Sequence, residues 1–372
     1  MSLFNRNIFK FLQVMLAFAP VALLTGCIND SELPCPDGER GSYITIRVVA
    51  PKAVTDRAAT RAIPDIDNTL YWGDNYISEK GLDFENALLK DEFDVFITEA
   101  DGTLITKLNN LICIEATSAT DEMLYSFTGD IPADAVEILK TKSDARIHIT
   151  ANSGSDVSLT SGLIYSHIGQ PSESFTAIPM WGVKSFDFTG LHPGQNDVGD
   201  IRLLRSMAKV EIVINSEVGT NQISELTSAT ATGVNGRGYV LPKGWNYGLV
   251  TETEGLSYEN SLNPLLPVGN ITGLAPTEDK SKIVFYLPET ANGDGIASLT
   301  LDYKLIGGLT KSNQIKFAKY VDGAATSTNY DIVRNHLYRF EVYLSGGQSD
   351  QFQIKYTVCQ WQEYEINPPT FD

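Results

Sequence analysis

The sequence has few of the side chains that build disulfide scaffolds or metal centres. Its 372 residues contain 4 cysteines and 4 histidines. Four cysteines in so long a chain exclude a disulfide framework of the kind that holds small secreted proteins together. The histidines are scattered, with no pair at metal-ligand spacing, and the chain has no Cys-x-x-Cys motif. We therefore expect no metal ion and no cofactor.

Motifs for catalysis are also missing. The chain has no Gly-x-Ser-x-Gly turn of the kind that holds a nucleophilic serine. Residues 233–238 have some of the glycine spacing of a phosphate-binding loop, but no lysine and no helix follow, so a hairpin turn is favoured. We predict no catalytic residue. A surface glycoside hydrolase stays an alternative, because its two carboxylates would meet only in three dimensions.

Basic residues are outnumbered. Lysine and arginine together number 28 against 46 acidic residues, a net charge of −18 at pH 7. A chain this acidic repels phosphate backbones, so we expect no nucleic-acid partner. Hydrophobic residues make up 42% of the chain and aromatic residues 10%, which is enough to fill packed cores and excludes wholesale disorder.

The chain has one long apolar run, at its start. Arg6 and Lys10 precede an apolar stretch from Phe11 to Leu24 that one glutamine and one proline interrupt. Basic and apolar regions in this order are typical of a secretory signal peptide, here residues 1–26. A membrane anchor is the alternative, but the run is shorter than the ~20 apolar residues that a bilayer span needs.

The signal ends in Leu24-Thr25-Gly26-Cys27, which resembles the bacterial lipobox. The resemblance implies cleavage before Cys27 and acylation of its thiol with fatty acids such as palmitate, which would anchor the chain in a membrane. An ordinary signal followed by an unrelated cysteine is the alternative. Residues 29–32, Asn-Asp-Ser-Glu, resemble the acidic tag that sends lipoproteins of Bacteroidetes to the cell surface.

Beyond a polar tether at residues 27–41, short alternating runs are broken by glycine, asparagine, aspartate and proline. This pattern is typical of antiparallel sheets with one buried face. It predicts strands at Tyr43–Ala50, Phe93–Thr98, Arg146–Ala151, Lys209–Ile214, Lys282–Leu287, Ser298–Leu305 and Arg339–Leu344. Asp101-Gly102 and Asn235-Gly236 indicate hairpin turns of the primed type. One helix is predicted at Pro132–Lys140.

So many short strands predict an all-β fold of two tandem β-sandwiches with few short helices. We expect the first at residues 42–202 and the second at 203–372, with the junction near residues 200–205, after the glycine- and proline-bearing stretch at 190–199. Within the first sandwich, residues 42–50 form the first strand and residues 51–62 a loop. Ile44, Ile46, Val48 and Ala50 share one face of that strand.

Some polar and aromatic residues keep two interpretations. Asp65, Asp67, Asp74 and Asp83 offer oxygen ligands, but the offsets of a calcium loop are absent and a solvated loop is favoured. Of Cys35, Cys113 and Cys359, one pair could form a disulfide. Trp72, Trp181 and Trp245 could offer aromatic platforms, although a tryptophan in a sandwich usually lies in the core. His148 alternates with apolar residues and is expected to be structural.

Several motifs together resemble the fimbrillins, the lipoprotein-derived subunits of the type V pili of Bacteroidetes. The main one is Ile178-Pro179-Met180-Trp181-Gly182 followed by Leu203-Leu204-Arg205-Ser206-Met207-Ala208-Lys209-Val210-Glu211-Ile212. Further matches are Thr60-Arg61-Ala62, Phe93-Asp94-Val95-Phe96-Ile97, Ile149-Thr150-Ala151-Asn152, Gly238-Tyr239-Val240-Leu241-Pro242, Phe285-Tyr286-Leu287-Pro288-Glu289 and Arg334-Asn335-His336-Leu337-Tyr338-Arg339-Phe340-Glu341-Val342.

The resemblance implies transthyretin-like sandwiches and assembly at the outer membrane by exchange of strands between subunits. If the first strand were released, it would leave unpaired backbone groups on both sides and vacant pockets where Ile44, Ile46, Val48 and Ala50 had been. Pilin maturation in this family uses an arginine-specific protease, so we expect cleavage after Arg61 or, failing that, Arg57. Two ordinary solvated arginines are the alternative.

A donor strand must then come from elsewhere in the chain. Residues 351–358 alternate and are favoured as the last strand of the second sandwich. The tail at residues 360–372 is the candidate donor, with Trp361, Tyr364, Ile366 and Phe371 as its anchors.

The sequence therefore predicts a non-enzymatic fimbrial subunit at the surface of the outer membrane, serving adhesion and biofilm formation. Its expected partners are other fimbrial subunits, outer-membrane lipid through Cys27, an arginine-specific protease and a surface ligand that the sequence does not identify. The alternative is a monomeric surface lipoprotein that binds glycan or host protein through its loops. Stalk, tip and anchor roles stay open.

Overall fold

The computed structural model describes residues 41–50, 83–89, 91–117, 123–153, 164–166, 168–242, 251–253, 268–344 and 351–360. Strands dominate this part of the chain, and its helices are short: α2 (Asp83–Asn86) and α3 (Ala133–Leu139). The all-β fold class is thereby confirmed. None of these helices is long and apolar enough to cross a lipid bilayer.

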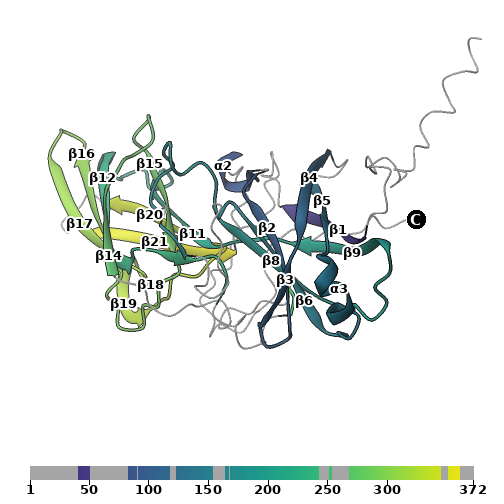
Figure 1. Ribbon diagram of the computed structural model, residues 1–372. Coiled ribbons are helices and arrows are strands. Elements are labelled where there is room, and N and C mark those ends of the chain that lie inside the picture. The colour runs from purple at the N-terminus through teal and green to yellow at the C-terminus, as the bar shows by residue number, and fades with distance from the viewer. Residues whose placement is uncertain are drawn as a thin grey trace, which may run out of the picture. The chain divides into compact units, whose positions relative to one another are not determined.

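Two sheets enclose the first hydrophobic core (Figure 1). One has the order β4-β5-β1-β9, formed by Asn109–Thr117, Met123–Asp130, Ser42–Ala50 and Gly194–Arg202. The other has the order β10-β8-β6-β2-β3, formed by Leu204–Arg205, Met180–Phe186, Ala145–Ala151, Phe93–Thr98 and Leu104–Lys107. Ile46 and Phe127 from the first sheet share this core with Val95 and Ile147 from the second. Two sheets packed face to face around one core make a β-sandwich.

A second pair of sheets encloses a separate core. One has the order β15-β11-β20-β21, formed by Lys282–Pro288, Met207–Ile214, His336–Leu344 and Phe352–Gln360. The other has the order β14-β12-β16-β17, formed by Val268–Leu274, Ile223–Asn235, Ser298–Leu305 and Thr310–Lys316. Val210 and Phe340 meet Leu301 and Ile315 in this core.

A third apolar cluster joins residues from both sequence halves. It includes Phe96 and Trp181 from strands of the first sandwich and Met207 and Tyr286 from strands of the second. Two small sheets complete the described strands: β7 (Ile164–Tyr165) pairs with β13 (Gly238–Tyr239), and β18 (Ala318–Val321) pairs with β19 (Ala324–Asn329). The domain boundary at residues 202 and 203 stays a prediction.

The regular elements follow the sequence pattern closely. Each of the seven predicted strands is present with its ends shifted by no more than three residues. The predicted helix is also present. Pro132 occupies its N-cap position with φ −53° and ψ 136°, and Ala135 and Leu139 are its buried residues. A proline at the start of a helix removes no internal hydrogen bond.

Both turn types were wrong. At Asp101-Gly102 the strands β2 and β3 do form a hairpin, but Gly102 alone of the two has positive φ, at 89°, whereas a primed type I turn needs two such residues. Asn235-Gly236 does not join a hairpin, because β12 pairs with β14 and β16 while β13 pairs with β7. The Asn235 side chain instead donates to the carbonyl of Glu289 in the core.

The glycine- and proline-bearing stretch at residues 190–199 was not among the predicted strands. Most of it belongs to β9, which pairs in parallel with β1. Its sequence, Gly-Gln-Asn-Asp-Val-Gly-Asp-Ile-Arg, has the composition of a loop, and its buried apolar side chains, Val198 and Ile201, lie three residues apart. A β-bulge between the partners of Thr45 and Ile46 breaks the alternation on which strand prediction depends.

Candidate functional site

The first strand, β1, lies inside its sheet and has a strand on each side. It pairs antiparallel with β5 and parallel with β9 (Figure 1). In this register Ile46 lies opposite Phe127 of β5 and opposite Gly199 of β9. The pairing with β5 is continued by a hydrogen bond of 3.0 Å from the Ile131 amide to the Ser42 carbonyl. Removal of β1 would therefore open a groove with unpaired backbone groups on both walls.

The inner face of β1 fills the first core. Ile44, Ile46 and Val48 are 0%, 1% and 0% exposed and belong to one cluster with side chains of the facing sheet. Ala50 lies opposite Met123 in the register, and its side chain is outside the described residues. At ~1.5–3 kcal/mol for each large apolar side chain, the three buried residues contribute roughly 5–9 kcal/mol.

The outer face of β1 carries one charged residue, Arg47. Its Nε donates to Asp200 Oδ1 at 2.6 Å, and its guanidinium also lies 3.9 Å from the Asp197 carboxylate. The side chains of Arg47 and Asp200 are 51% and 59% exposed. Ion pairs this exposed contribute about 1 kcal/mol or less, so the buried side chains dominate the stability of β1.

Strand β9 is held by groups other than β1. The Nζ of Lys184, on β8, donates to the carbonyls of Val198 and Asp200 at 3.1 and 3.3 Å. A side chain at Gly199, whose φ is +79°, would lie 3.3 Å from that Nζ. The hydroxyl of Thr253 donates to the Arg202 carbonyl at 2.6 Å. Sequence reasoning missed β9 because its residues lack an alternating apolar pattern. It missed Lys184 because no local signal marks a lysine whose partners lie on β9.

The other predicted site residues lie outside the described part of the chain. These are the lipidation residue Cys27, the cleavage residues Arg57 and Arg61, and the donor anchors Trp361, Tyr364, Ile366 and Phe371. The segment before the tail is described: β21 pairs antiparallel with β20 along its length, so residues 352–358 lie in the last described strand of the second sandwich, as favoured. The same strand includes Gln360, the first residue of the predicted tail.

Trp181 and His148 are structural. Trp181 is 0% exposed and its Nε1 donates to His148 Nδ1 at 3.2 Å, while His148 Nε2 lies 3.1 Å from the Thr98 hydroxyl. Burial, assisted by the charge of Arg146, lowers the pKa of His148 to about 3. The ring is therefore neutral at pH 7, and Trp181 offers no platform to a glycan. Trp72 and Trp245 lie outside the described residues.

The charged residues of the main fimbrillin-like motif form a buried network. Lys209 Nζ contacts Glu85 Oε1 at 2.8 Å and Glu211 Oε1 at 3.1 Å, and Glu85 Oε1 also accepts from the Tyr286 hydroxyl at 2.7 Å. The Nε of Arg205 donates to the Glu85 carbonyl at 2.9 Å. Glu85 lies on α2, directly after a segment without apolar periodicity, so the sequence did not single it out.

Burial alone would raise the pKa of Glu211. The charges of Lys209, Lys282 and Arg339 together outweigh that effect and hold the pKa at about 2. Lys282 contacts the Glu211 carboxylate at 2.9 Å, and Arg339 contacts the same carboxylate at 2.6 Å. The network therefore keeps an ionised carboxylate in the interior and has no access for a substrate, because Glu85 and Glu211 are both 0% exposed.

The fimbrillin-like motifs at residues 285–289 and 334–342 contribute a second buried ion pair. Arg334 Nη2 contacts Glu289 Oε2 at 2.7 Å, and Arg334 Nη1 donates to the Val240 carbonyl at 2.6 Å. Arg334 and Glu289 are 1% and 4% exposed. The motifs that suggested the resemblance are thus mainly residues of cores and of buried networks.

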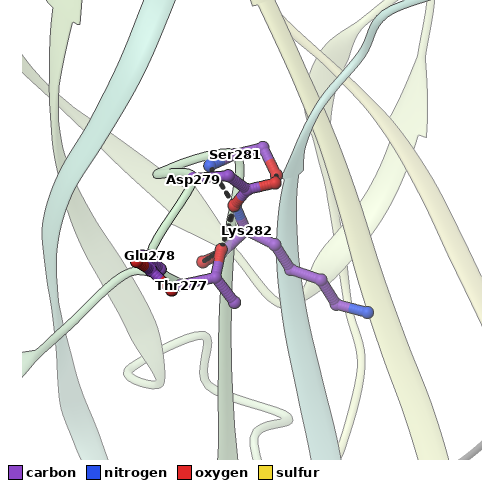
Figure 2. Close-up of a pocket in the computed structure, with 5 residues that line it drawn as sticks. All are labelled: Thr277, Glu278, Asp279, Ser281 and Lys282. Carbon is purple, nitrogen blue, oxygen red and sulfur yellow. Dashed lines mark hydrogen bonds between the residues drawn. The ribbon is translucent and has the colours of Figure 1, made fainter.

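The surface hollow in Figure 2 lies at the turn between β14 and β15 and is lined by Thr277, Glu278, Asp279, Ser281 and Lys282. The Asp279 carboxylate accepts from the hydroxyls of Thr277 and Ser281 at 2.6 and 2.7 Å, and these bonds lower its pKa to about 2. The turn thus satisfies its own polar groups. Among the described residues no three or more potential metal ligands gather.

No protein-family model and no curated protein matches the chain. Several solved structures do. The tip fimbrial protein Mfa3 of Porphyromonas gingivalis, with a C-terminal truncation, is 13% identical with a TM-score of 0.47, covering 86% of this chain and 100% of that one. A fimbrilin (FimA) of Porphyromonas gingivalis W83 is 12% identical with a TM-score of 0.44, covering 86% and 98%.

A protein of Bacteroides eggerthii DSM 20697, provisionally named a cell adhesion protein, is 15% identical with a TM-score of 0.44, covering 87% of this chain and 96% of that one. The solved structures similar to this chain thus include fimbrial and cell-adhesion proteins of Bacteroidetes.

Proposed function

We propose that this chain is a structural subunit of a cell-surface fimbria that assembles by exchange of its first strand. The observation that carries the proposal is β1: an interior strand with three fully buried apolar side chains, directly followed by a segment that contains Arg57 and Arg61. A strand in this place can leave after a single backbone cut behind it.

The groove explains why assembly would be strong. Refilling the pockets of Ile44, Ile46 and Val48 restores roughly 5–9 kcal/mol before ordering costs. The backbone groups of β5 and β9 would also regain partners, as when a peptide adds a strand to an open sheet. A strand from a neighbouring subunit can supply both terms.

The remaining parts of the proposal come from the sequence. The chain would be exported as a lipoprotein, acylated at Cys27 and displayed at the outer membrane. An arginine-specific protease would cut after Arg61 or Arg57, and the tail at residues 360–372 would be the donor. Residues 42–202 and 203–372 would be the two domains. The subunit would support adhesion and biofilm formation without enzymatic activity.

Limited digestion of the purified full chain with an arginine-specific protease tests this proposal. We expect N-terminal sequencing to find a new end at residue 62 or 58, and size-exclusion chromatography to show oligomers that grow with protein concentration. The matched control is the double variant R57K/R61K, which should resist the cut and stay monomeric. Digested protein that has lost the segment before the cut and still elutes as a monomer at high concentration would contradict strand exchange.

A further inference from the structure

Besides its apolar pockets, the groove that β1 would leave has two exposed carboxylates on its β9 wall. We call these two residues, Asp197 and Asp200, the charged lip. We propose that Asp197 and Asp200 make the groove select an incoming strand with a basic side chain at the position of Arg47. This inference rests on the proposed function, because it describes the strand that would replace β1. The partner it defines is a strand with apolar residues at its first, third and fifth positions and lysine or arginine at its fourth. The tail at residues 360–372 of this chain contains no lysine or arginine, so the strand selected by this groove would come from another kind of subunit, and the tail would serve a different groove.

The native occupant has this pattern. Ile44, Ile46 and Val48 point into the core, and Arg47, the one charged residue of β1, lies between the second and third of them on the outer face. Arg47 and Asp200 are partners in the parallel register, with 2.6 Å between Nε and Oδ1. Asp197 lies 3.9 Å from the guanidinium. One cation is thus flanked by two carboxylates of a single strand.

The lip would stay in place when β1 leaves. Among the described strands β1 is the one partner of β9, so β9 needs other attachments to remain a wall of the groove. Lys184 supplies them by donating to the carbonyls on either side of Gly199. The side chains of Val198 and Ile201, which are 4% and 2% exposed, also attach β9 to the first core. Lys184 donates to backbone carbonyls of β9, whereas Arg47 of β1 contacts the side-chain carboxylates of Asp197 and Asp200.

Charge can discriminate between strands whose apolar side chains fit the pockets equally well. Apolar pockets accept different strands with an alternating apolar pattern, because apolar side chains of similar volume replace one another at a cost usually below about 1.5 kcal/mol. A glutamate at the fourth position would face Asp197 and Asp200 with like charge, and a neutral residue would lose the ionic contacts that Arg47 makes with them. Repulsion of wrong partners is a common source of specificity between strands and between subunits.

Peptide binding to the vacated groove tests the proposal. The protein is the full chain cut by the arginine-specific protease and freed of the segment before the cut in mild denaturant, followed by dialysis. The probes are fluorescent nine-residue peptides with the sequence of residues 42–50 and its R47K, R47Q and R47E versions. We expect the arginine and lysine peptides to bind alike and the glutamate peptide roughly tenfold more weakly at low salt. The difference should fall to about twofold in ~1 M salt, where the screening length is about 3 Å.

The matched control is the double variant D197N/D200N. Both carboxylates are exposed, so the uncut variant should melt within a few degrees of the wild type, and the four peptides should bind it within about twofold of one another. A charge-reversed groove, D200K, should favour the R47E peptide. A variant that melts far below the wild type is replaced by the single variants D197N and D200N, each expected to halve the preference.

The outcomes separate two failures. If no peptide binds the cut protein, the strand-exchange function itself is wrong. If all four peptides bind equally at low salt, the groove exists but the lip does not select, and this inference is wrong. A preference for arginine that persists in D197N/D200N would also overturn it.

Discussion

Replacing Glu211 with glutamine is expected to lower the free energy of unfolding by about 3 kcal/mol at pH 7. Glu211 is 0% exposed and is the shared partner of Lys209, Lys282 and Arg339. Removal of one partner from a buried ion pair leaves the opposite charge without compensation, which typically costs about 3–5 kcal/mol. The lower figure applies because Lys282 is 24% exposed and Arg339 12%. Urea unfolding of the two proteins measures the difference.

The same carboxylate makes a prediction for pH. Its pKa is about 2 in the folded chain against an ordinary value of 4.5. A lowered pKa in the folded state stabilises the fold above the unfolded pKa and ceases to do so as pH falls through the folded one. The stability from Glu211 should therefore be complete above pH ~4.5 and disappear between there and pH ~2. The E211Q variant should lack this part of the acid limb, so its deficit against the wild type should shrink at pH 3.

The control for E211Q is the same substitution at an exposed cluster. Glu225 contacts Lys280 at 3.1 Å and Lys304 at 3.3 Å and is 36% exposed. Solvent screens such pairs, so E225Q should change stability by less than about 1 kcal/mol. Equal losses for E211Q and E225Q would show that burial does not govern the network. Parallel pH curves for E211Q and wild type would contradict the low pKa.

Replacing Ile46 with alanine is expected to lower the free energy of unfolding of the uncut chain by about 2–5 kcal/mol. Ile46 is 1% exposed in the first core, and truncation of such a side chain loses its transfer free energy and leaves a cavity. In the cut chain the same change should speed the loss of β1, because the strand is then held less tightly. Thermal melts measure the first effect, and the rate at which the released fragment separates measures the second.

The matched control is I112A, the same substitution on the outer face of β4 in the same sheet. Ile112 is 42% exposed, so its truncation should change stability by no more than about 1 kcal/mol and leave the release of β1 unchanged. If I46A and I112A had the same melting temperature, β1 would not be bound through its apolar face. If I46A were unstable but released β1 no faster, the strand would leave by a step that does not involve these pockets.

The strands and the helix could be predicted because their signals are local. Alternation of Ile44, Ile46 and Val48 follows from the two-residue period of a strand, whatever the strand pairs with. The helix at residues 133–139 likewise begins with a proline whose φ suits a helix start. Local geometry also limits such reasoning, since Asp101-Gly102 was correctly placed at a hairpin but given the wrong turn type.

By itself, the sequence determined the all-β class, the buried face of the first strand and the absence of a recognisable catalytic motif, because hydrophobic period and residue type act over a few neighbours. Only the tertiary structure decided that β1 lies between β5 and β9, that Asp197 and Asp200 flank Arg47, and that Glu85 joins Lys209. Those partners are distant in sequence, up to 153 residues for Arg47 and Asp200. Which of many compatible strands and charges come together depends on the packing of the whole chain, and no short window of sequence contains that information.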